Sequence, residues 1–215
     1  HALCAALDPI FERVSIDHSY ACRVGKGQQA AVRHAQRLAR RQKFFLRLDI
    51  EHYFETARHA AVLRDVRRVV SCAPTLRLVS RFLDHGAPGS QPGTGLPIGN
   101  LTSQHFANFH LAGLDHLILE RCPASGYLRY MDDMLLFSGT KTSLWECHER
   151  IATWLGARGL RLKRTVTAVA PVTQGVPFLG FRIWPRVIRL DAARRRRMFR
   201  KVRGIEAAVQ AEARL

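Results

Sequence analysis

Two adjacent aspartates, Asp132 and Asp133, stand between two apolar runs, residues 128–131 and 134–137. Apolar and aromatic runs of this length are typical of short strands, so a tight turn at Met131-Asp132 would place both carboxylates at the tip of a hairpin. Neighbouring carboxylates raise each other's pKa unless a cation lies between them, and divalent metals that bind through oxygen are the usual solution. An ordinary polar hairpin tip is the alternative, because Asp is common in turns.

A third carboxylate, Asp49, lies near the end of the apolar run 44–50, which reads as a buried strand. Burial of a carboxylate costs free energy unless it is paired or bound to a metal, although a cap or turn role would also explain Asp49 alone. Together the three aspartates indicate phosphoryl transfer with two divalent ions about 3.5–4 Å apart. One ion would activate a 3′-hydroxyl and the other would neutralise the triphosphate and leaving pyrophosphate, while the protein positions groups and stabilises charge.

The charge of the chain favours a polyanionic partner. Its 215 residues carry 34 Lys and Arg against 17 Asp and Glu, a formal net charge of +17. This excess predicts nucleic acid before a membrane, with a merely soluble basic surface as the alternative. No apolar run approaches the ~18 residues of a membrane span.

The five cysteines are scattered without a CxxC pair. That spacing argues against a zinc site and fits a reducing, cytoplasmic location better than secretion. The chain opens without an initiator Met or the layout of a signal peptide, so we expect an excised fragment.

Hydrophobic periodicity predicts an α+β chain in which helices and strands are mixed along the sequence. Helices are predicted at 1–14, 28–43, 56–71, 74–85, 106–118, 140–157 and 191–214. Strands are predicted at 44–50, on both sides of the Met131-Asp132 turn, at 160–169, and as a pair within 176–184. The last helix begins with seven cations close together, a density typical of nucleic-acid contact.

Four segments resemble, in order, the motifs of reverse transcriptases: the fingers segment, the first aspartate motif, the palm signature and the primer-grip hairpin. They are residues 20–27, 48–54, 130–133 and 178–181. The resemblance covers almost the whole chain and implies a polymerase palm, an antiparallel sheet backed by helices. It divides the chain into partial fingers (1–43), palm (44–185) and the start of a basic thumb helix (186–215). The family's first fingers strand and the rest of its thumb have no counterpart, so we expect weak grip on the template-primer.

The segment 98–104 narrows the resemblance. Its Gln104 follows Ser103 where retroviral and group II intron enzymes usually carry proline. This pattern resembles reverse transcriptases of diversity-generating retroelements, which are bacterial or phage-encoded. Those enzymes copy a template RNA with frequent errors at adenines, aided by a small basic accessory protein. A retron or group II intron reverse transcriptase/maturase, and a palm-fold RNA-binding scaffold that no longer polymerises, remain as alternatives.

The resemblance also assigns roles. Asp49, Asp132 and Asp133, with the Ile50 carbonyl, would hold two Mg²⁺ ions, for which Mn²⁺ can substitute. Phe54 matches the aromatic steric gate, whose ring would exclude a 2′-hydroxyl. The deoxynucleotide triphosphate would meet Arg23, Lys26, Tyr53, Phe54, Gly99, Ser103, Gln104 and Lys163, with Arg164 competing for the last role. Template RNA and DNA primer would meet Tyr130, Met131, Phe178, Leu179, Gly180, Arg194, Arg195 and Arg197.

Overall fold

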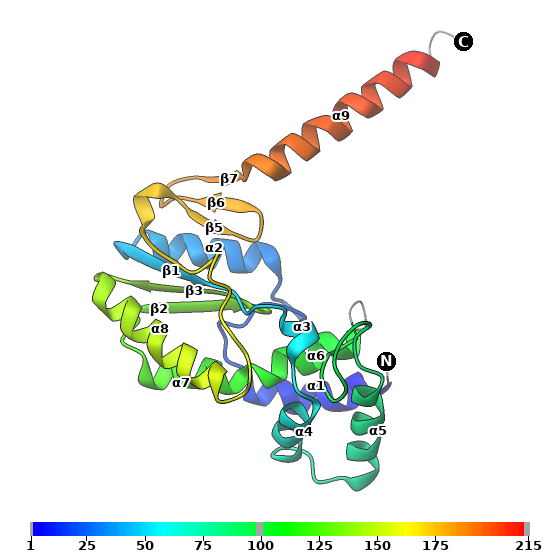
Figure 1. Ribbon diagram of the computed structural model, residues 1–215. Helices are drawn as coiled ribbons and strands as arrows, with labels where there is room; N and C mark the ends of the chain where they lie inside the picture. Colours follow the sequence, from blue (N-terminus) through cyan, green and yellow to red (C-terminus); the bar gives the residue numbers. More distant parts are fainter. Residues whose placement is uncertain (1, 98–100, 213–215) are drawn as a thin grey trace.

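A four-stranded antiparallel sheet with the strand order β2-β3-β1-β4 forms the centre of the molecule (Figure 1). The computed structural model describes residues 2–97 and 101–212. The strands are β1 Phe44–Leu48, β2 Gly126–Tyr130, β3 Asp133–Ser138 and β4 Ala168–Pro171. The mixture of this sheet with flanking helices confirms the predicted α+β class.

Alternation along β1 divides its side chains between two cores, because successive residues of a strand point to opposite faces. Leu46 and Leu48 join the larger core, while Phe45 joins a smaller one. Helix α2, Gln28–Ala39, covers the smaller core, and Figure 1 shows it on the face of the sheet opposite α7 and α8. The larger core includes residues of α1 Ala2–Val14, α6 Leu101–His110, α7 Ala112–Arg121 and α8 Lys141–Gly156.

A second, smaller sheet lies beside α2 and leads to the last helix. Its order is β5-β6-β7, built from Val176–Phe178, Phe181–Ile183 and Ile188–Leu190. Gln28 at the start of α2 donates to the Leu179 carbonyl in the β5–β6 turn, with a nitrogen–oxygen distance of 2.8 Å. Helix α9, Ala192–Glu212, follows β7 and projects away from the sheets in Figure 1.

Three further helices extend from the end of β1 at the opposite end of the molecule from α9 (Figure 1). They are α3 Tyr53–Thr56, α4 His59–Arg67 and α5 Ala73–Asp84. A partly buried contact of 2.7 Å between His110 Nδ1 and Asp65 Oδ2 joins α4 to α6. The structure thus fixes this helical end to the same core that supports the sheet.

Several element boundaries differ from the sequence prediction. The predicted helix through 106–118 is interrupted at Leu111, where the Ala107 carbonyl is shared by the Leu111 amide and the Tyr53 hydroxyl. The predicted strand 160–169 is wrong for most of its length, because residues 163–167 form a turn and only β4 pairs as a strand. Helix α2 ends before residue 43, α4 begins after residue 56, and β7 was not predicted.

Among helices within residues 2–97 and 101–212, none combines the length and the apolar character that crossing a membrane requires.

Candidate active site

The paired aspartates lie at the β2–β3 turn. Tyr130 pairs with Asp133, so Met131 and Asp132 form the two-residue connection, as predicted. Strand β1 is the other neighbour of β3, and its last registered pair joins Leu48 to Met134. Continuing that register by one residue brings Asp49 opposite Asp133 at the same end of the sheet.

Burial raises the pKa of all three carboxyl groups, and repulsion between carboxylates adds to the rise for two of them. Loss of hydration is the main cause for each, because a buried site disfavours the charged form. The Asp49 charge adds to the rise for Asp132 and Asp133. The pKa of Asp133, the most buried of the three, is raised to about 6. The three charges therefore interact, and a cation between them would relieve their repulsion.

Two cations of the protein partly supply that relief. Arg47 precedes Asp49 by two residues on the same face of β1, and its Nε and Nη2 donate to the two Asp133 oxygens at 3.1 and 3.0 Å. Lys163 is brought to Asp49 by backbone pairing, in which its amide donates to the Asp49 carbonyl at 2.8 Å. Its charge lowers the pKa of Asp49 and Asp132 against the effect of burial. Lys163, one of two candidates for the leaving pyrophosphate, is thus paired through its backbone with Asp49, whereas the contact of Arg47 with Asp133 was not predicted.

Oxygen donors of this kind fit a hard divalent cation. As the side chains stand, no three His, Cys, Asp or Glu within the described part of the chain are close enough to hold a metal. At Asp133, both carboxylate oxygens accept hydrogen bonds from Arg47. The donor set fits the metal, and Arg47 competes with it for one of the three carboxylates.

The two aromatic residues after Asp49 have different environments. Phe54 is half-buried, and its ring meets that of Tyr53 at 70°, with 5.7 Å between the ring centroids. Tyr53 is 1% exposed and its hydroxyl donates to the Ala107 carbonyl at 2.9 Å. The Tyr53 side chain is therefore a core residue, which leaves Phe54 as the aromatic ring that a nucleotide could meet.

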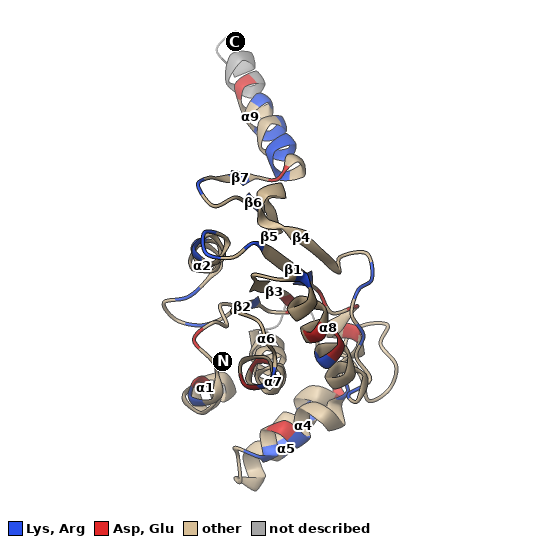
Figure 2. Cartoon of the chain, turned by 90° about the vertical axis from the view of Figure 1, so that its left-hand side faces the viewer, with Lys and Arg blue, Asp and Glu red and all other residues tan. Residues whose placement is uncertain are grey.

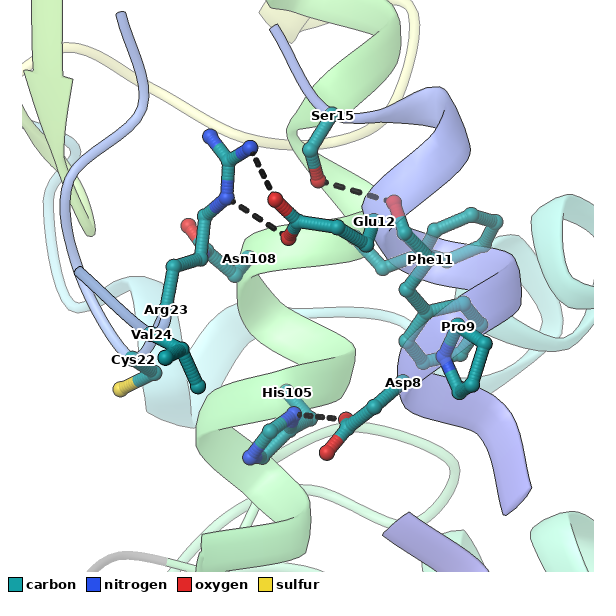
Figure 3. Close-up of a pocket in the computed structure, with 11 residues that line it drawn as sticks. Asp8, Pro9, Phe11, Glu12, Ser15, Cys22, Arg23, Val24, His105 and Asn108 are labelled. Carbon is teal, nitrogen blue, oxygen red and sulfur yellow. Dashed lines mark hydrogen bonds and ion pairs between the residues drawn. The ribbon is translucent and has the colours of Figure 1, made fainter. Parts of the chain in front are cut away.

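The predicted fingers residues hold the loop that contains them. Arg23 donates from Nε and Nη2 to the Glu12 carboxylate at 2.8 and 2.6 Å (Figure 3). It also donates to the carbonyls of Ile16 and Ser19. Lys26 donates to the Asp17 carbonyl at 2.9 Å. Arg23 is 6% exposed as a side chain and borders a cavity of about 290 Å³ between α1, this loop and α6. It is not a free phosphate ligand in this arrangement.

Helix α6 carries the predicted Ser103 and Gln104. Ser103 is buried, and its hydroxyl oxygen has no hydrogen-bond partner within the described residues. Gln104 Oε1 accepts a hydrogen bond from the Cys22 thiol at 3.1 Å, which joins α6 to the loop that contains Arg23 and Lys26, here called the fingers loop. Gly99 lies outside the residues that the structure describes.

The predicted primer-grip residues form a tight turn. Leu179 and Gly180 connect β5 to β6, and both have positive φ, 49° and 76°. Phe178 is buried beneath them, and the Arg194 guanidinium lies 5.5 Å from the Phe181 ring centroid. Arg195 and Arg197 are exposed on α9, whose cations are visible in Figure 2. Tyr130 and Met131 are half-buried at the β2–β3 turn.

Sequence reasoning missed the buried polar residues that support the turn. Arg129, on β2 directly before Tyr130, forms a buried ion pair of 2.5 Å with Asp115 on α7. A charged residue inside an otherwise apolar strand was the available signal. Its partner, 14 residues away along the chain, could not be identified from local pattern.

Comparison with known proteins gives this geometry a family. The family model described as reverse transcriptase (RNA-dependent DNA polymerase) matches residues 2–183. Among curated proteins, YkfC of Escherichia coli (strain K12) is 25% identical over 228 aligned positions, which cover 85% of this chain and 59% of YkfC. The putative COX1/OXI3 intron 1 protein of Saccharomyces cerevisiae is 24% identical over 115 positions, 51% of this chain and 14% of that protein. The chain therefore spans less than two thirds of the length of either relative.

Solved structures show the same fold at low identity. The apo telomerase from Candida tropicalis, truncated from its C-terminal domain, superposes with a TM-score of 0.69 at 11% identity, over 88% of this chain and 45% of that one. The telomerase from Candida albicans in complex with a TWJ fragment of telomeric RNA gives 0.62 at 10%, over 89% and 37%. The family model spans most of the chain, and these structures share its architecture. The chain belongs to the reverse transcriptase family.

Proposed function

We propose that this chain carries the palm of an RNA-directed DNA polymerase, which adds deoxynucleotides to the 3′-hydroxyl of a DNA primer paired with template RNA. One observation carries the proposal: the sheet register sets the Asp49 end of β1 against the Asp132-Asp133 turn. Membership of the reverse transcriptase family supports the choice of substrates. In domain terms we propose partial fingers at 1–43, palm at 44–185 and the start of the thumb at 186–215.

The three carboxylates, with the Ile50 carbonyl, are the groups that would hold two Mg²⁺ ions, or Mn²⁺ in their place. Bound there, the ions would supply Lewis acidity to the primer hydroxyl and to the triphosphate. The protein itself positions these groups: β1 and the β2–β3 turn hold the carboxylates at one end of the sheet, and Lys163 brings positive charge beside them. We assign Lys163 to the leaving pyrophosphate.

We also assign the remaining nucleotide contacts. We assign the half-buried Phe54 ring to the sugar, where it would exclude a 2′-hydroxyl. Gln104, held by Cys22, and Ser103 lie on α6, and we assign both to the nucleotide and template base. We propose the same role for Gly99, which lies outside the described residues. Arg23 and Lys26 would act on the triphosphate only after exchanging partners, since both now hold the loop.

We assign the nucleic-acid duplex to the side of the molecule that carries the β5–β6 turn and α9. The turn at Phe178, Leu179 and Gly180, with Tyr130 and Met131 at the catalytic turn, would meet the primer. Exposed Arg195 and Arg197, with Arg194 nearer the turn, would meet backbone phosphates, whose charge dominates the affinity of such contacts.

The test is deoxynucleotide incorporation on an RNA template with a DNA primer in Mg²⁺. Asp132→Asn removes one carboxylate charge at the turn and should reduce kcat at least about 100-fold. Asp84→Asn makes the same change at an exposed helix end and should leave incorporation unchanged. Equal activity in the two variants would contradict the assignment of the site. Tight RNA binding without incorporation in the wild-type protein would favour the RNA-binding scaffold.

We further propose the diversity-generating subtype, on the strength of Gln104 after Ser103, with a small basic accessory protein as partner. Sequencing the cDNA tests it, because substitutions should concentrate at template adenines and grow when the partner is added. A second candidate is a group II intron enzyme with maturase function, favoured by the name of the yeast relative, an intron 1 protein. That candidate, like a retron enzyme, predicts no preference for errors at adenine.

A further inference from the structure

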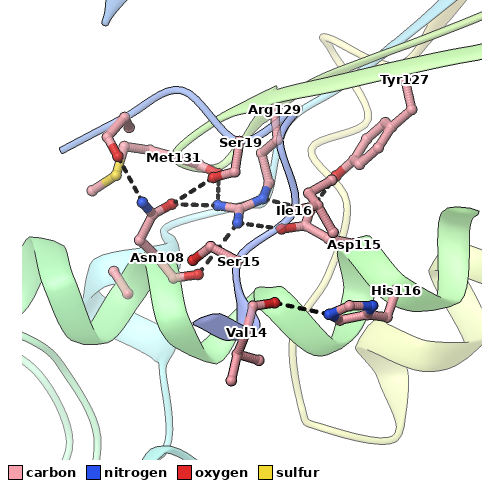
Figure 4. Close-up of polar contacts among 12 residues, drawn as sticks. Val14, Ser15, Ile16, Ser19, Asn108, Asp115, His116, Tyr127, Arg129 and Met131 are labelled. Carbon is pink, nitrogen blue, oxygen red and sulfur yellow. Dashed lines mark hydrogen bonds and ion pairs between the residues drawn. The ribbon is translucent and has the colours of Figure 1, made fainter. Parts of the chain in front are cut away.

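A polar network is buried beneath the catalytic turn, centred on Arg129 (Figure 4). Arg129 and Asp115 are 1% and 0% exposed. Two bonds join them, from Nε to Oδ1 at 2.7 Å and from Nη2 to Oδ2 at 2.5 Å. The Tyr127 hydroxyl donates to the same Asp115 oxygen as Nε, at 2.6 Å. Burial of two charges is costly, so a pair like this one persists only when its hydrogen bonds are complete.

All five N–H groups of a guanidinium have acceptors here. Besides the two bonds to Asp115, Nη1 donates to Asn108 Oδ1 at 2.7 Å and to the Met131 carbonyl at 2.9 Å. Nη2 donates to the Asn108 carbonyl at 3.3 Å. One of these five hydrogen bonds, from Nη1 to the Met131 carbonyl, is thus directed at the β2–β3 turn.

The carbonyl that Arg129 holds belongs to the peptide linking Met131 to Asp132. Met131 has a φ of 55°, a left-handed conformation that residues with a Cβ adopt at a cost. Two-residue hairpin turns usually place Gly, Asn or Asp at such a position. A strained turn needs the surrounding structure to determine it, and the Arg129 bond fixes the peptide that orients Asp132.

The same network reaches the fingers loop. Asn108 Nδ2 donates to the Ala21 carbonyl at 2.7 Å. The Arg129 amide donates to the His18 carbonyl at 2.9 Å, and the Tyr20 amide donates back to the Arg129 carbonyl at 3.0 Å. The loop that carries Arg23 and Lys26 is therefore attached to the residue that holds the catalytic turn.

We infer that Arg129 is a positioning residue for polymerisation: its guanidinium sets the Met131-Asp132 peptide, and through Asn108 it holds the fingers loop in register with that turn. The inference rests on the proposed function only in taking the turn as catalytic. This role differs from a merely stabilising one. The bonds to the turn should affect kcat, and the bonds to the loop should affect the KM for deoxynucleotide.

Arg129→Lys tests the branch to the turn. Lysine keeps the charge beside Asp115, but its single ammonium cannot reach Asp115, Asn108 and the Met131 carbonyl together. Misplacement of Asp132 should lower kcat about 100-fold, with a much smaller change in the KM for deoxynucleotide. It should also weaken Mn²⁺ binding, measured from the free-ion signal in electron paramagnetic resonance without substrate.

Tyr127→Phe is the matched control, because it removes one bond to Asp115 and nothing from the turn. It should lower Tm while kcat and Mn²⁺ binding stay at wild-type values. The inference is overturned if Arg129→Lys retains wild-type kcat and Mn²⁺ binding, or if both variants lose activity in proportion to Tm.

Asn108→Ala tests the branch to the loop and decides the matter if Arg129→Lys does not fold. It should raise the KM for deoxynucleotide about tenfold, the equivalent of 1.4 kcal/mol, with kcat nearly preserved. A KM equal to that of Tyr127→Phe would refute the coupling. If the wild-type protein incorporates nothing, the proposed function fails, and Mn²⁺ binding by the Arg129→Lys and Tyr127→Phe variants still judges the positioning.

Discussion

Arg47 is the counter-charge that the protein itself provides for Asp133. The pair is bidentate, a geometry that only a planar guanidinium offers. The side chains are 25% and 12% exposed, so water screens the pair only partly. Burial nevertheless keeps the pKa of Asp133 raised, to about 6. The carboxylate cluster is thus destabilising to the fold, and Arg47 offsets part of that cost.

Arg47→Met tests how far Arg47 offsets the cost of burying the Asp133 carboxylate. Without divalent ions the variant should lose about 2 kcal/mol of unfolding free energy, the usual worth of hydrogen bonds to a charged group. Saturating Mg²⁺ should then raise its Tm more than it raises that of the wild-type protein, because the ion replaces the missing counter-charge and meets no competitor at Asp133. Thermal unfolding with and without Mg²⁺ measures both effects.

Arg13→Met serves as the control, since Arg13 is exposed at the end of α1. Its Mg²⁺ response should equal that of the wild-type protein. An equal response in Arg47→Met would mean that Arg47 and the ion do not share Asp133.

At the scale of elements, the sequence predicted what local pattern determines. The apolar runs around Asp132 and Asp133 predicted the β2–β3 hairpin and its turn, and the structure confirms both. Alternation also predicted a strand over 160–169, but backbone pairing of this segment with Asp49 stops at Lys163, where the chain turns. The alternation of apolar residues alone could not show where backbone pairing with the neighbouring segment ends.

The supporting contacts of the site were beyond prediction for a related reason. The Arg129–Asp115 and Arg23–Glu12 pairs join different elements, and no local spacing specifies such partners. Motif resemblance assigned Arg23 to phosphate, whereas the fold gives its guanidinium to Glu12. Residue types indicated which side chains could carry charge, whereas the tertiary fold determined which residue each one pairs with.

The β5–β6 turn depends on a glycine at its second position. Gly180 has a φ of 76°, and a Cβ there would meet the side chain of Arg194. Gly180→Ala should therefore cost about 1 kcal/mol of unfolding free energy, chiefly from the left-handed backbone. Urea denaturation measures the loss.

Gly204→Ala makes the same change inside α9, where a Cβ meets nothing within 4 Å. Alanine is the better helix former, so this variant should be no less stable than the wild-type protein. Equal stability of the two variants would show that the turn tolerates a side chain at Gly180.

At the scale of the molecule, positive charge gathers on a helix that the rest of the fold barely contacts. Helix α9 carries exposed cations from Arg194 to Arg203 and projects beyond the β5-β6-β7 sheet (Figure 2). Helices α4 and α5 lie at the opposite end in both views, and they are also basic. The net charge of +17 alone does not distinguish the two ends as nucleic-acid contacts.

Removing charge from each end separately would distinguish them. Replacing Arg195, Arg196 and Arg197 by Gln should weaken template-primer binding and flatten its salt dependence, by roughly 0.7–0.9 in the logarithmic slope for each phosphate that the protein no longer neutralises. Replacing Arg67, Arg77 and Arg81 by Gln removes the same charge from α4 and α5, where all three are exposed, and should leave the slope near that of the wild-type protein. Binding titrations over a salt series measure both slopes. Equal flattening in the two variants would mean that overall charge, rather than α9, attracts the nucleic acid.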